Sequence, residues 1–433
     1  MNRRDFVLHA AALTALPALG RPGITTAAPA RVNGPRLNGW LAAFRPIGLT
    51  AGGTNRVAYS EADLAGRAFT LDLIRQAGLT PRLDAAGNIF ARLAGTVPSL
   101  KPILIGSHVD SVTDGGNYDG PVGTFGAIEV ARTLREQNIR LRHPLDVVVW
   151  QNEEGGTIGS KIAVGMLTDA DLDKVARSGR TIREGIALIG GNVAQLGSAT
   201  LKRGDIAGYI ELHIEQSGLL EQASTNIGVV QGIVGLRWIE VTITGFANHA
   251  GATAMDQRQD AMLAAAKFTV AVNDAIRAEP GRQVATVGRL VATPNTTNVV
   301  AGQVVLTVDL RDLDDTKIAR FATAFEQLGA RIGSATRTTF SFRTLVESTA
   351  ALADASIMTA IEGSASALGL SAMRMPSGAG HDAQEVGHIA PMGMIFIPSI
   401  GGISHSPKEF STPEDIAHGA DVLLNAVIAL DRR

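Results

Sequence analysis

A chain of 433 residues, of which 45% are hydrophobic and 18% charged, has the composition of a globular protein and is long enough for two domains. The formal net charge is −2 and no basic stretch is long, which excludes an extended nucleic-acid-binding surface. The chain has no cysteine, so a thiolate nucleophile and a disulfide framework are excluded, and any metal must be bound by histidines and carboxylates.

The first part of the chain, residues 1–30, has the pattern of a targeting segment. Arg3 and Arg4 precede a weakly apolar run over 6–20, and a small-residue cleavage pattern follows at 28–30. The run is shorter than the roughly 20 residues that a membrane span needs. The arginine pair is typical of a twin-arginine export signal, with an ordinary secretory signal as the alternative. We therefore expect a periplasmic protein without stable membrane association.

Helical and strand patterns alternate after this segment. In chain order, the expected elements are helix 38–44, helix 61–77, strand 88–92, strand 102–105, helix 123–136, strand 147–150, strand 209–212 and, near the far end, strand 394–397. The run at 147–150 is apolar throughout, which is typical of a strand buried on both faces of a parallel sheet.

The middle of the chain follows a different pattern. Hydrophobic and polar residues alternate over 239–244 and 304–311, as in strands with one covered and one open face, and a long helical pattern runs from Asp256 to Arg277. We expect residues 236–346 to form a smaller α+β domain. It would be inserted into a main domain that consists of residues 31–235 and 347–433.

Polar residues gather where four of the predicted strands end. Strand by strand, they are His108 with Asp110 and Asp119, then Glu153 with Glu154, then His213, and finally His405. Open parallel sheets bind ligands at the edge formed by the carboxyl ends of their strands. The sequence therefore predicts an α/β fold with a mostly parallel sheet that brings these side chains to one edge.

The residue types at this edge are those of a metal site. A neutral imidazole such as His108 is a good ligand for zinc or manganese, and Asp110, two residues on, is placed to accept a hydrogen bond from its second ring nitrogen. Asp119, in a glycine-rich loop, is a candidate bridge between two metals. Two adjacent carboxylates at a buried strand end, Glu153 and Glu154, need a cation to stay ionised. Taken alone, that pair also fits an exposed acidic turn, and a lone histidine fits a structural loop position.

From about Arg36 to its end, the chain resembles the carbamoylase branch of the aminoacylase-like di-metal amidohydrolases. This branch includes N-carbamoyl-L-amino-acid hydrolase, β-ureidopropionase and allantoate amidohydrolase. The resemblance is carried, in chain order, by GGTNRVAYSEAD, DAAGNIFARLAG, GSHVDSVTDGGNYDG, NEEG, ELHIEQ, NHAG, the pair Asn298 and Arg311, SGAGHDA and GGISHSPKE. It implies a di-metal catalytic domain with an inserted lid and dimerisation domain. The implied reaction is hydrolysis of the C–N bond of an N-carbamoyl amino acid or a similar small carboxylate-bearing amide.

The resemblance implies two divalent ions per subunit, zinc or manganese, with cobalt or nickel as alternatives. Their implied ligands are His108 and His213 for one ion, Glu154 and His405 for the other, and Asp119 between them. Glu153 would act as general base and acid, and Asp110 would orient His108.

The resemblance also implies a set of substrate contacts. Arg311 and Asn298, with Gln216 near them, would bind the substrate carboxylate. His249 and Arg237 would polarise the scissile carbonyl, in this family typically across a dimer. We therefore expect a homodimer that forms through the inserted domain and acts on a small molecule, with no nucleic-acid partner.

Three loops depart from the family pattern, so the substrate stays open. The departures are Gly156-Thr157-Ile158 for Ser-Arg-Phe, Ala252-Thr253-Ala254-Met255 for TTPM, and Gln216-Ser217-Gly218 for EQG. The competing hypotheses are an allantoate amidohydrolase, a di-metal aminoacylase or exopeptidase, and a non-enzymatic binding protein. The last predicts decayed ligands, whereas all five ligand positions and the base are present.

Overall fold

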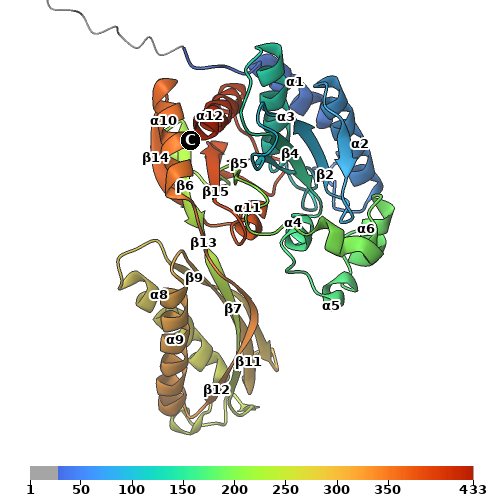
Figure 1. Cartoon of the computed structure of the whole chain (residues 1–433). Coiled ribbons are helices and arrows are strands. Elements are labelled where there is room, and N and C mark those ends of the chain that lie inside the picture. The colour runs from blue at the N-terminus through green and yellow to red at the C-terminus, as the bar shows by residue number, and fades with distance from the viewer. Residues whose placement is uncertain (1–27, 433) are drawn as a thin grey trace, which may run out of the picture.

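The computed structural model describes residues 28–432, so the predicted export segment lies outside the described residues apart from its last positions, 28–30. The described part of the chain folds around two main sheets, each with its own helices (Figure 1), and also contains a two-stranded sheet of β8 Asn248–His249 and β10 Val299–Val300. Within the described part of the chain, no helix is both long and apolar enough to span a membrane.

The larger sheet has nine strands in the order β1-β2-β4-β3-β5-β15-β6-β13, with β14 also paired to β6. Strands β3, β4, β5 and β15 are mutually parallel, so the predicted α/β fold with a largely parallel central sheet is confirmed. The strands are β1 Pro81–Leu83, β2 Ile89–Leu93, β3 Ile103–His108, β4 Leu145–Trp150, β5 Gly208–Ile214, β6 Ile227–Ile233, β13 Ala351–Leu352, β14 Ala372–Ser377 and β15 Met392–Ile397.

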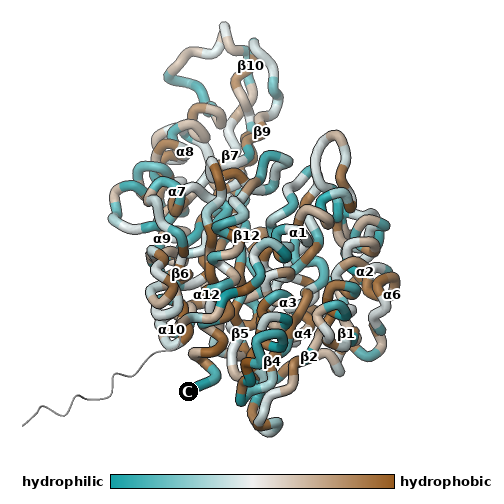
Figure 2. Tube along the Cα trace, turned by 90° about the horizontal axis from the view of Figure 1, so that it is seen from above, coloured by the Kyte–Doolittle hydropathy of each residue, from teal (hydrophilic) through white to brown (hydrophobic). Residues whose placement is uncertain are grey.

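Helices cover both faces of this sheet and bury two hydrophobic clusters. The run 147–150 of β4 is apolar because both of its faces are covered: Val147 and Val149 contact one cluster, and Val148 and Trp150 contact the other. Hydrophobic stretches accordingly run through the interior of the molecule in Figure 2. The helices are α1 Gly34–Phe44, α2 Glu61–Gln76, α3 Pro121–Glu136, α4 Ile158–Ala163, α5 Asp169–Leu172, α6 Ile182–Leu188, α7 Leu219–Gln222, α10 Ala355–Ala367, α11 Asp382–Val386 and α12 Pro413–Asp431, with short 3-10 turns η1 Val193–Ala199 and η3 Ile400–Gly402.

Residues 235–348 form the smaller sheet, which is antiparallel in the order β12-β7-β11-β9, and its helices; we refer to them as the β7–β12 unit. Helices α8 and α9 pack on one face, where the predicted alternation buries Ile239, Val241 and Ile243. The elements are β7 Gly235–Thr244, β8 Asn248–His249, η2 Met255–Gln257, α8 Ala261–Arg277, β9 Val284–Thr293, β10 Val299–Val300, β11 Gln303–Asp312, α9 Asp315–Thr336 and β12 Thr339–Ser348.

The predicted start of the long helix in this unit, Asp256, is wrong. The α8 helix begins at Ala261 because the Asp260 side chain accepts hydrogen bonds from the N–H groups of Met262 and Leu263. Residues 255–257 form the separate 3-10 turn η2.

The chain passes between the two sheets at two places that lie side by side. Strand β6 leads into β7 through Val234, and β12 leads back into β13. Strands β6 and β13 are paired there, with Ile233 opposite Ala351 and Gly232 opposite Leu352.

Candidate metal centre

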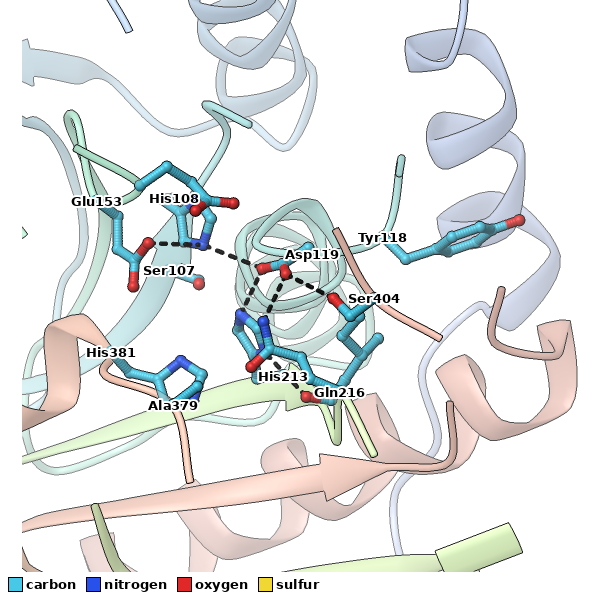
Figure 3. A network of polar contacts seen from close by, with 12 residues as sticks. Ser107, His108, Tyr118, Asp119, Glu153, His213, Gln216, Ala379, His381 and Ser404 are labelled. Atoms are coloured by element: carbon cyan, nitrogen blue, oxygen red, sulfur yellow. Dashed lines mark hydrogen bonds and ion pairs between the residues drawn. The ribbon is translucent and has the colours of Figure 1, made fainter. Parts of the chain in front are cut away.

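Parallel pairing brings the polar clusters to one edge of the larger sheet. His108 is the last residue of β3, and Asp119 lies in the loop between β3 and α3. His213 lies near the end of β5, Glu154 follows β4 and His405 follows β15. His108 is paired with Trp150 at the end of β4, so the loop that carries Glu153 and Glu154 starts beside it. Figure 3 shows several of these side chains turned toward one carboxylate, that of Asp119.

The Asp119 carboxylate lies between two groups of ligand candidates. Its Oδ1 is 3.5 Å from His108 Nε2 and 3.1 Å from His213 Nε2. Its Oδ2 is 3.4 Å from His405 Nε2, which in turn is 3.6 Å from Glu154 Oε1. Both groups are compact enough to hold a metal ion, and they share Asp119. The structure thus brings the five predicted ligand residues together in two groups that share Asp119; a further candidate group consists of His213 with Glu211 and His381.

The local backbone allows this close approach. Asp119 is followed by Gly120, the N-cap of α3, whose φ is +81°. A β-carbon at this position would lie 2.5 Å from the His108 ring, so a side chain would displace the imidazole.

Several ligand atoms in these groups have no hydrogen-bond partner although they are buried. They are His108 Nε2, His213 Nε2 and Glu154 Oε1. Buried polar atoms are normally paired, so unpaired atoms that converge on one carboxylate fit a bound cation. Nitrogen and oxygen donors of this kind suit zinc and manganese.

The raised pKa values of Glu153 and Glu154 indicate that these carboxylates need a nearby positive charge to stay ionised. Burial raises the pKa of Glu153 well above its ordinary value and that of Glu154 to about 7, with the nearby carboxylates adding to the effect. Glu153 is only 9% exposed, so the alternative of an exposed acidic turn is wrong. Burial also acts to raise the pKa of Asp119, but His213 and His108 outweigh it and hold that pKa well below its ordinary value.

Main-chain carbonyl groups orient the histidines. His108 Nδ1 lies 3.1 Å from the carbonyl oxygen of Asp110, and His213 Nδ1 lies 2.9 Å from that of Ile214. These contacts favour the tautomer that leaves Nε2 free as a metal ligand. The Asp110 carboxylate, which we expected in this role, is farther away, at 3.7 Å from His108 Nδ1.

The Asp110 carboxylate instead holds the loop after β4. Its two oxygens accept hydrogen bonds from the N–H groups of Glu153 and Glu154, at 3.2 and 3.1 Å. Asp110 therefore fixes the backbone of the predicted base and its neighbouring ligand.

Asp119 is itself held by residues from two further loops. Gln216 Nε2 donates to its Oδ2 at 2.6 Å, and Ser404 Oγ donates to the same oxygen at 3.1 Å. Glu409 accepts hydrogen bonds from the N–H groups of Tyr118 and Asp119 at 2.9 and 3.0 Å, and from Ser404 Oγ at 3.0 Å. Gln216 was expected near the substrate carboxylate, whereas here it contacts the shared metal-ligand candidate.

The sequence reasoning gave no role to Ser404, Glu409 or His381, although all three lie in motifs that carried the resemblance. The His381 ring is buried 4.5 Å from the His213 ring, centroid to centroid, and its Nε2 is 2.9 Å from Ser377 Oγ (Figure 3). The SGAGHDA and GGISHSPKE motifs were therefore the available signal for these residues.

Arg311 is the predicted substrate residue that contacts the larger sheet's loops. Its Nε and Nη2 donate to the two carboxylate oxygens of Asp309, at 2.9 and 2.8 Å. Its Nη1 donates to the carbonyl oxygen of Gly378 at 2.7 Å, in the loop that leads to His381.

The other predicted substrate residues of the β7–β12 unit, unlike Gln216, lie apart from the ligand candidates. Arg237 forms an ion pair with Glu347 and, by strand alternation, lies on the helix-covered face of its sheet, opposite to Arg311. His249 is exposed, with Nδ1 accepting main-chain hydrogen bonds. Asn298 contributes its carbonyl oxygen to Ala250 N–H at 2.9 Å. In residues 28–432, no hydrogen bond or ion pair joins these three side chains to a ligand candidate.

Comparisons with known proteins agree with this geometry. Residues 104–429 match the model of peptidase family M20/M25/M40. The N-carbamoyl-L-amino acid amidohydrolase of Geobacillus stearothermophilus is 37% identical over 87% of this chain and 93% of that protein. The allantoate amidohydrolase of Bacillus subtilis is 32% identical over 90% of this chain and 95% of that protein.

A crystal structure of a hydantoinase/carbamoylase family amidase from Burkholderia ambifaria matches with a TM-score of 0.86 and 35% identity, covering 93% of this chain and 98% of that one. The similarity therefore extends over the metal-centre edge and the β7–β12 unit alike. These matches, together with the two groups of ligand candidates that share the Asp119 carboxylate, show that the chain belongs to peptidase family M20/M25/M40, within its carbamoylase branch.

Proposed function

We propose that this protein hydrolyses the C–N bond of a ureido group in a small substrate that also bears a carboxylate, with N-carbamoyl-L-amino acids as the first substrate class. The names of the relatives, an N-carbamoyl-L-amino acid amidohydrolase and an allantoate amidohydrolase, support this class. The observation that carries the proposal is the buried Glu153 carboxylate beside two ligand groups that share Asp119.

The residues fit two divalent ions, for which His108 and His213 would form one site, Glu154 and His405 the other, and Asp119 the bridge. When bound, such ions acidify an attacking water and polarise a carbonyl oxygen. Glu153, with Oε2 3.7 Å from His108 Nε2, is placed beside the first site. It takes the proton of the water and then delivers it to the leaving nitrogen. An N-carbamoyl amino acid thereby yields ammonia, carbon dioxide and the amino acid.

Substrate selection falls to the β7–β12 unit, which we propose acts as a lid and as a dimerisation surface. Arg311 reaches the loop beside the metal centre, which supports a role in holding the substrate carboxylate. His249 and Asn298 lie on the paired strands β8 and β10 or directly before them, and His249 is exposed. The exposure of His249 supports a role in which its side chain contacts the substrate in the metal centre of a second subunit.

A substrate panel tests the function. The purified protein, freed of metal and reloaded with Zn²⁺ or Mn²⁺, is incubated with N-carbamoyl-L-amino acids, allantoate and dipeptides, and ammonia and free amino acid are measured. We expect metal-dependent ammonia release from the ureido substrates. Cleavage of dipeptides without ammonia release from any ureido acid would instead make the protein an exopeptidase.

We also propose export to the periplasm, which the pattern at Arg3 and Arg4 supports. Arg3→Lys with Arg4→Lys should leave the protein in the cytoplasm, measured by cell fractionation. An unchanged periplasmic yield would point to an ordinary secretory signal.

A further inference from the structure

The ion pair between Asp309 and Arg311 points to a role for Asp309 that no comparison assigns. We propose that Asp309 is a positioning residue, which holds the Arg311 guanidinium so that one edge of it stays available to the substrate carboxylate. This inference rests on the proposed function, because it needs a substrate that bears a carboxylate.

The contacts of Arg311 show which edge is taken. A guanidinium presents one edge with Nε and Nη2 and another with Nη1 and Nη2, and each matches a carboxylate. Asp309 accepts from Nε and Nη2, at 2.9 and 2.8 Å, and therefore covers the first edge. One N–H of Nη2 and the two of Nη1 are left, and one Nη1 proton goes to the carbonyl oxygen of Gly378 at 2.7 Å.

The strand geometry makes this pairing rigid. Asp309 and Arg311 are two residues apart on β11, so both side chains leave the same face of the sheet. Their side chains are 32% and 25% exposed, and an ion pair at this exposure contributes little to stability. Its main effect is orientation, because an arginine side chain otherwise samples many rotamers.

The remaining edge is directed at the metal-centre side of the molecule. Gly378 follows Ser377, whose Oγ is 2.9 Å from His381 Nε2, and the His381 ring contacts His213. A carboxylate bound at the Nη1 and Nη2 edge would thus lie next to the loop that lines the metal ligands.

Asp309 has two opposite effects on the binding of the substrate carboxylate. The larger of the two determines whether Asp309→Asn lowers or raises kcat/KM. Asp309 orients the guanidinium, but its negative charge also repels a second carboxylate at the same arginine. If orientation dominates, Asp309→Asn lowers kcat/KM for the acid substrate. If charge dominates, the same change raises it.

The experiment compares Asp309→Asn, Arg311→Lys and the control Glu240→Gln with the parent in the metal-loaded enzyme. Glu240 pairs with Arg343 on the same face, opposite Thr307 in the register, so its change also removes an ion pair of this sheet. Each variant is assayed with an N-carbamoyl amino acid and with the corresponding amide, which lacks the carboxylate.

We expect Asp309→Asn to lower kcat/KM for the acid about tenfold, mainly through KM, and to leave the amide unchanged. Glu240→Gln should match the parent for both. An unchanged or increased kcat/KM of Asp309→Asn for the acid overturns the inference, and so does a parallel loss for acid and amide. If the parent itself turns over acid and amide equally and Arg311→Lys has no effect, the proposed role of Arg311 fails instead.

Discussion

Both carboxylate oxygens of Asp119 face histidines, and its main-chain N–H is held by Glu409. The three hydrogen bonds that Glu409 accepts come from the Asp119 loop and from Ser404, which itself donates to Asp119. A buried carboxylate in this position fixes both the backbone and the side chain of the shared ligand. Such supporting residues tune metal affinity without touching the metal.

Replacing Glu409 should therefore weaken metal binding. We expect Glu409→Ala to lower metal affinity about 10–100-fold, because the N–H groups of Tyr118 and Asp119 lose their acceptor. Glu409→Gln, which keeps one acceptor oxygen, should lose less. Titration calorimetry of the metal-free variants measures this, and parental affinity in Glu409→Ala would contradict it.

Separate substitutions of the two adjacent glutamates after β4 distinguish the proposed general base, Glu153, from the proposed metal ligand, Glu154. Glu153→Gln should keep the metal content of the parent but lower kcat by roughly two to four orders of magnitude, because it removes the proton acceptor. Glu154→Gln should instead lose metal, because it removes a ligand oxygen. Metal analysis and ammonia release on the same preparations distinguish the two. Substantial activity in Glu153→Gln would rule out the assigned role.

The ligand candidates could be predicted from the sequence because each lies at or after the end of a strand of a parallel sheet. Parallel pairing brings such positions together at one edge. The sequence could not predict which group accepts from the His108 ring or which groups donate to the Asp110 carboxylate, because residues between strands can turn either a carbonyl group or a side chain toward the ring. Arg237 shows the same limit, since strand alternation places it on the covered face of its sheet and only the register reveals its partner, Glu347.

At the scale of elements, several apolar side chains of α8 and β9 remain exposed in residues 28–432. β9 is an edge strand of its sheet, with Val284, Leu290 and Val291 exposed. Leu263 and Val270 are exposed on α8. Exposed edges and apolar patches of this kind mark association surfaces. The surface supports the proposed homodimer.

A charge among these exposed side chains should prevent the proposed homodimer from forming. Val270 is 59% exposed, so Val270→Glu should fold normally but elute as a monomer in size-exclusion chromatography with light scattering. Val175→Glu, at a 69% exposed valine of the larger domain's loops, is the matched control and should stay dimeric. A monomeric parent would contradict the proposed assembly.

The sequence predicted strands β2, β3, β4, β5 and β15 of the larger sheet and β7 and β11 of the smaller one, because alternation and continuous apolar runs distinguish half-buried from fully buried strands. It did not predict β1, β6, β13 and β14 of the larger sheet or β9 and β12 of the smaller one. It placed the start of α8 too early, since η2 and the Asp260 cap interrupt a helical pattern that hydrophobic spacing alone cannot divide. The pairing of β6 with β13, β14 and β15 was not predicted, because long-range register leaves no local signal.

For the whole molecule, metal binding and stability should depend on pH together. In the metal-free protein, burial raises the pKa of Glu154 from 4.5 to about 7, and the contact with Asp119 raises that of His405 from 6.5 to about 9. The folded state thus holds both protons more tightly than the unfolded state. Their stabilisation is lost as the pH rises, through 4.5 to 7 for Glu154 and through 6.5 to 9 for His405.

Divalent ions bound at the proposed site would replace these protons, so the increase in Tm on adding Mn²⁺ should be larger at about pH 8 than at about pH 6. Thermal unfolding of the metal-free and metal-saturated protein at both pH values measures the difference. Glu154→Gln with His405→Gln should reduce it. An equal increase at both pH values would show that these protons do not compete with the metal.

The two chain crossings between the sheets lie side by side and are hydrogen-bonded as β6 and β13. We expect such a pair of bonded strands to bend more easily about one axis than to slide along its length, so a movement of the β7–β12 unit would be a rotation about that axis. Arg311 would then move along one path, and its guanidinium would come to lie at one fixed distance from the proposed metal centre. The protein would then select substrates by the number of bonds between the carboxylate and the ureido carbon. A comparison of kcat/KM for α- and β-ureido acids of equal size would measure this selection.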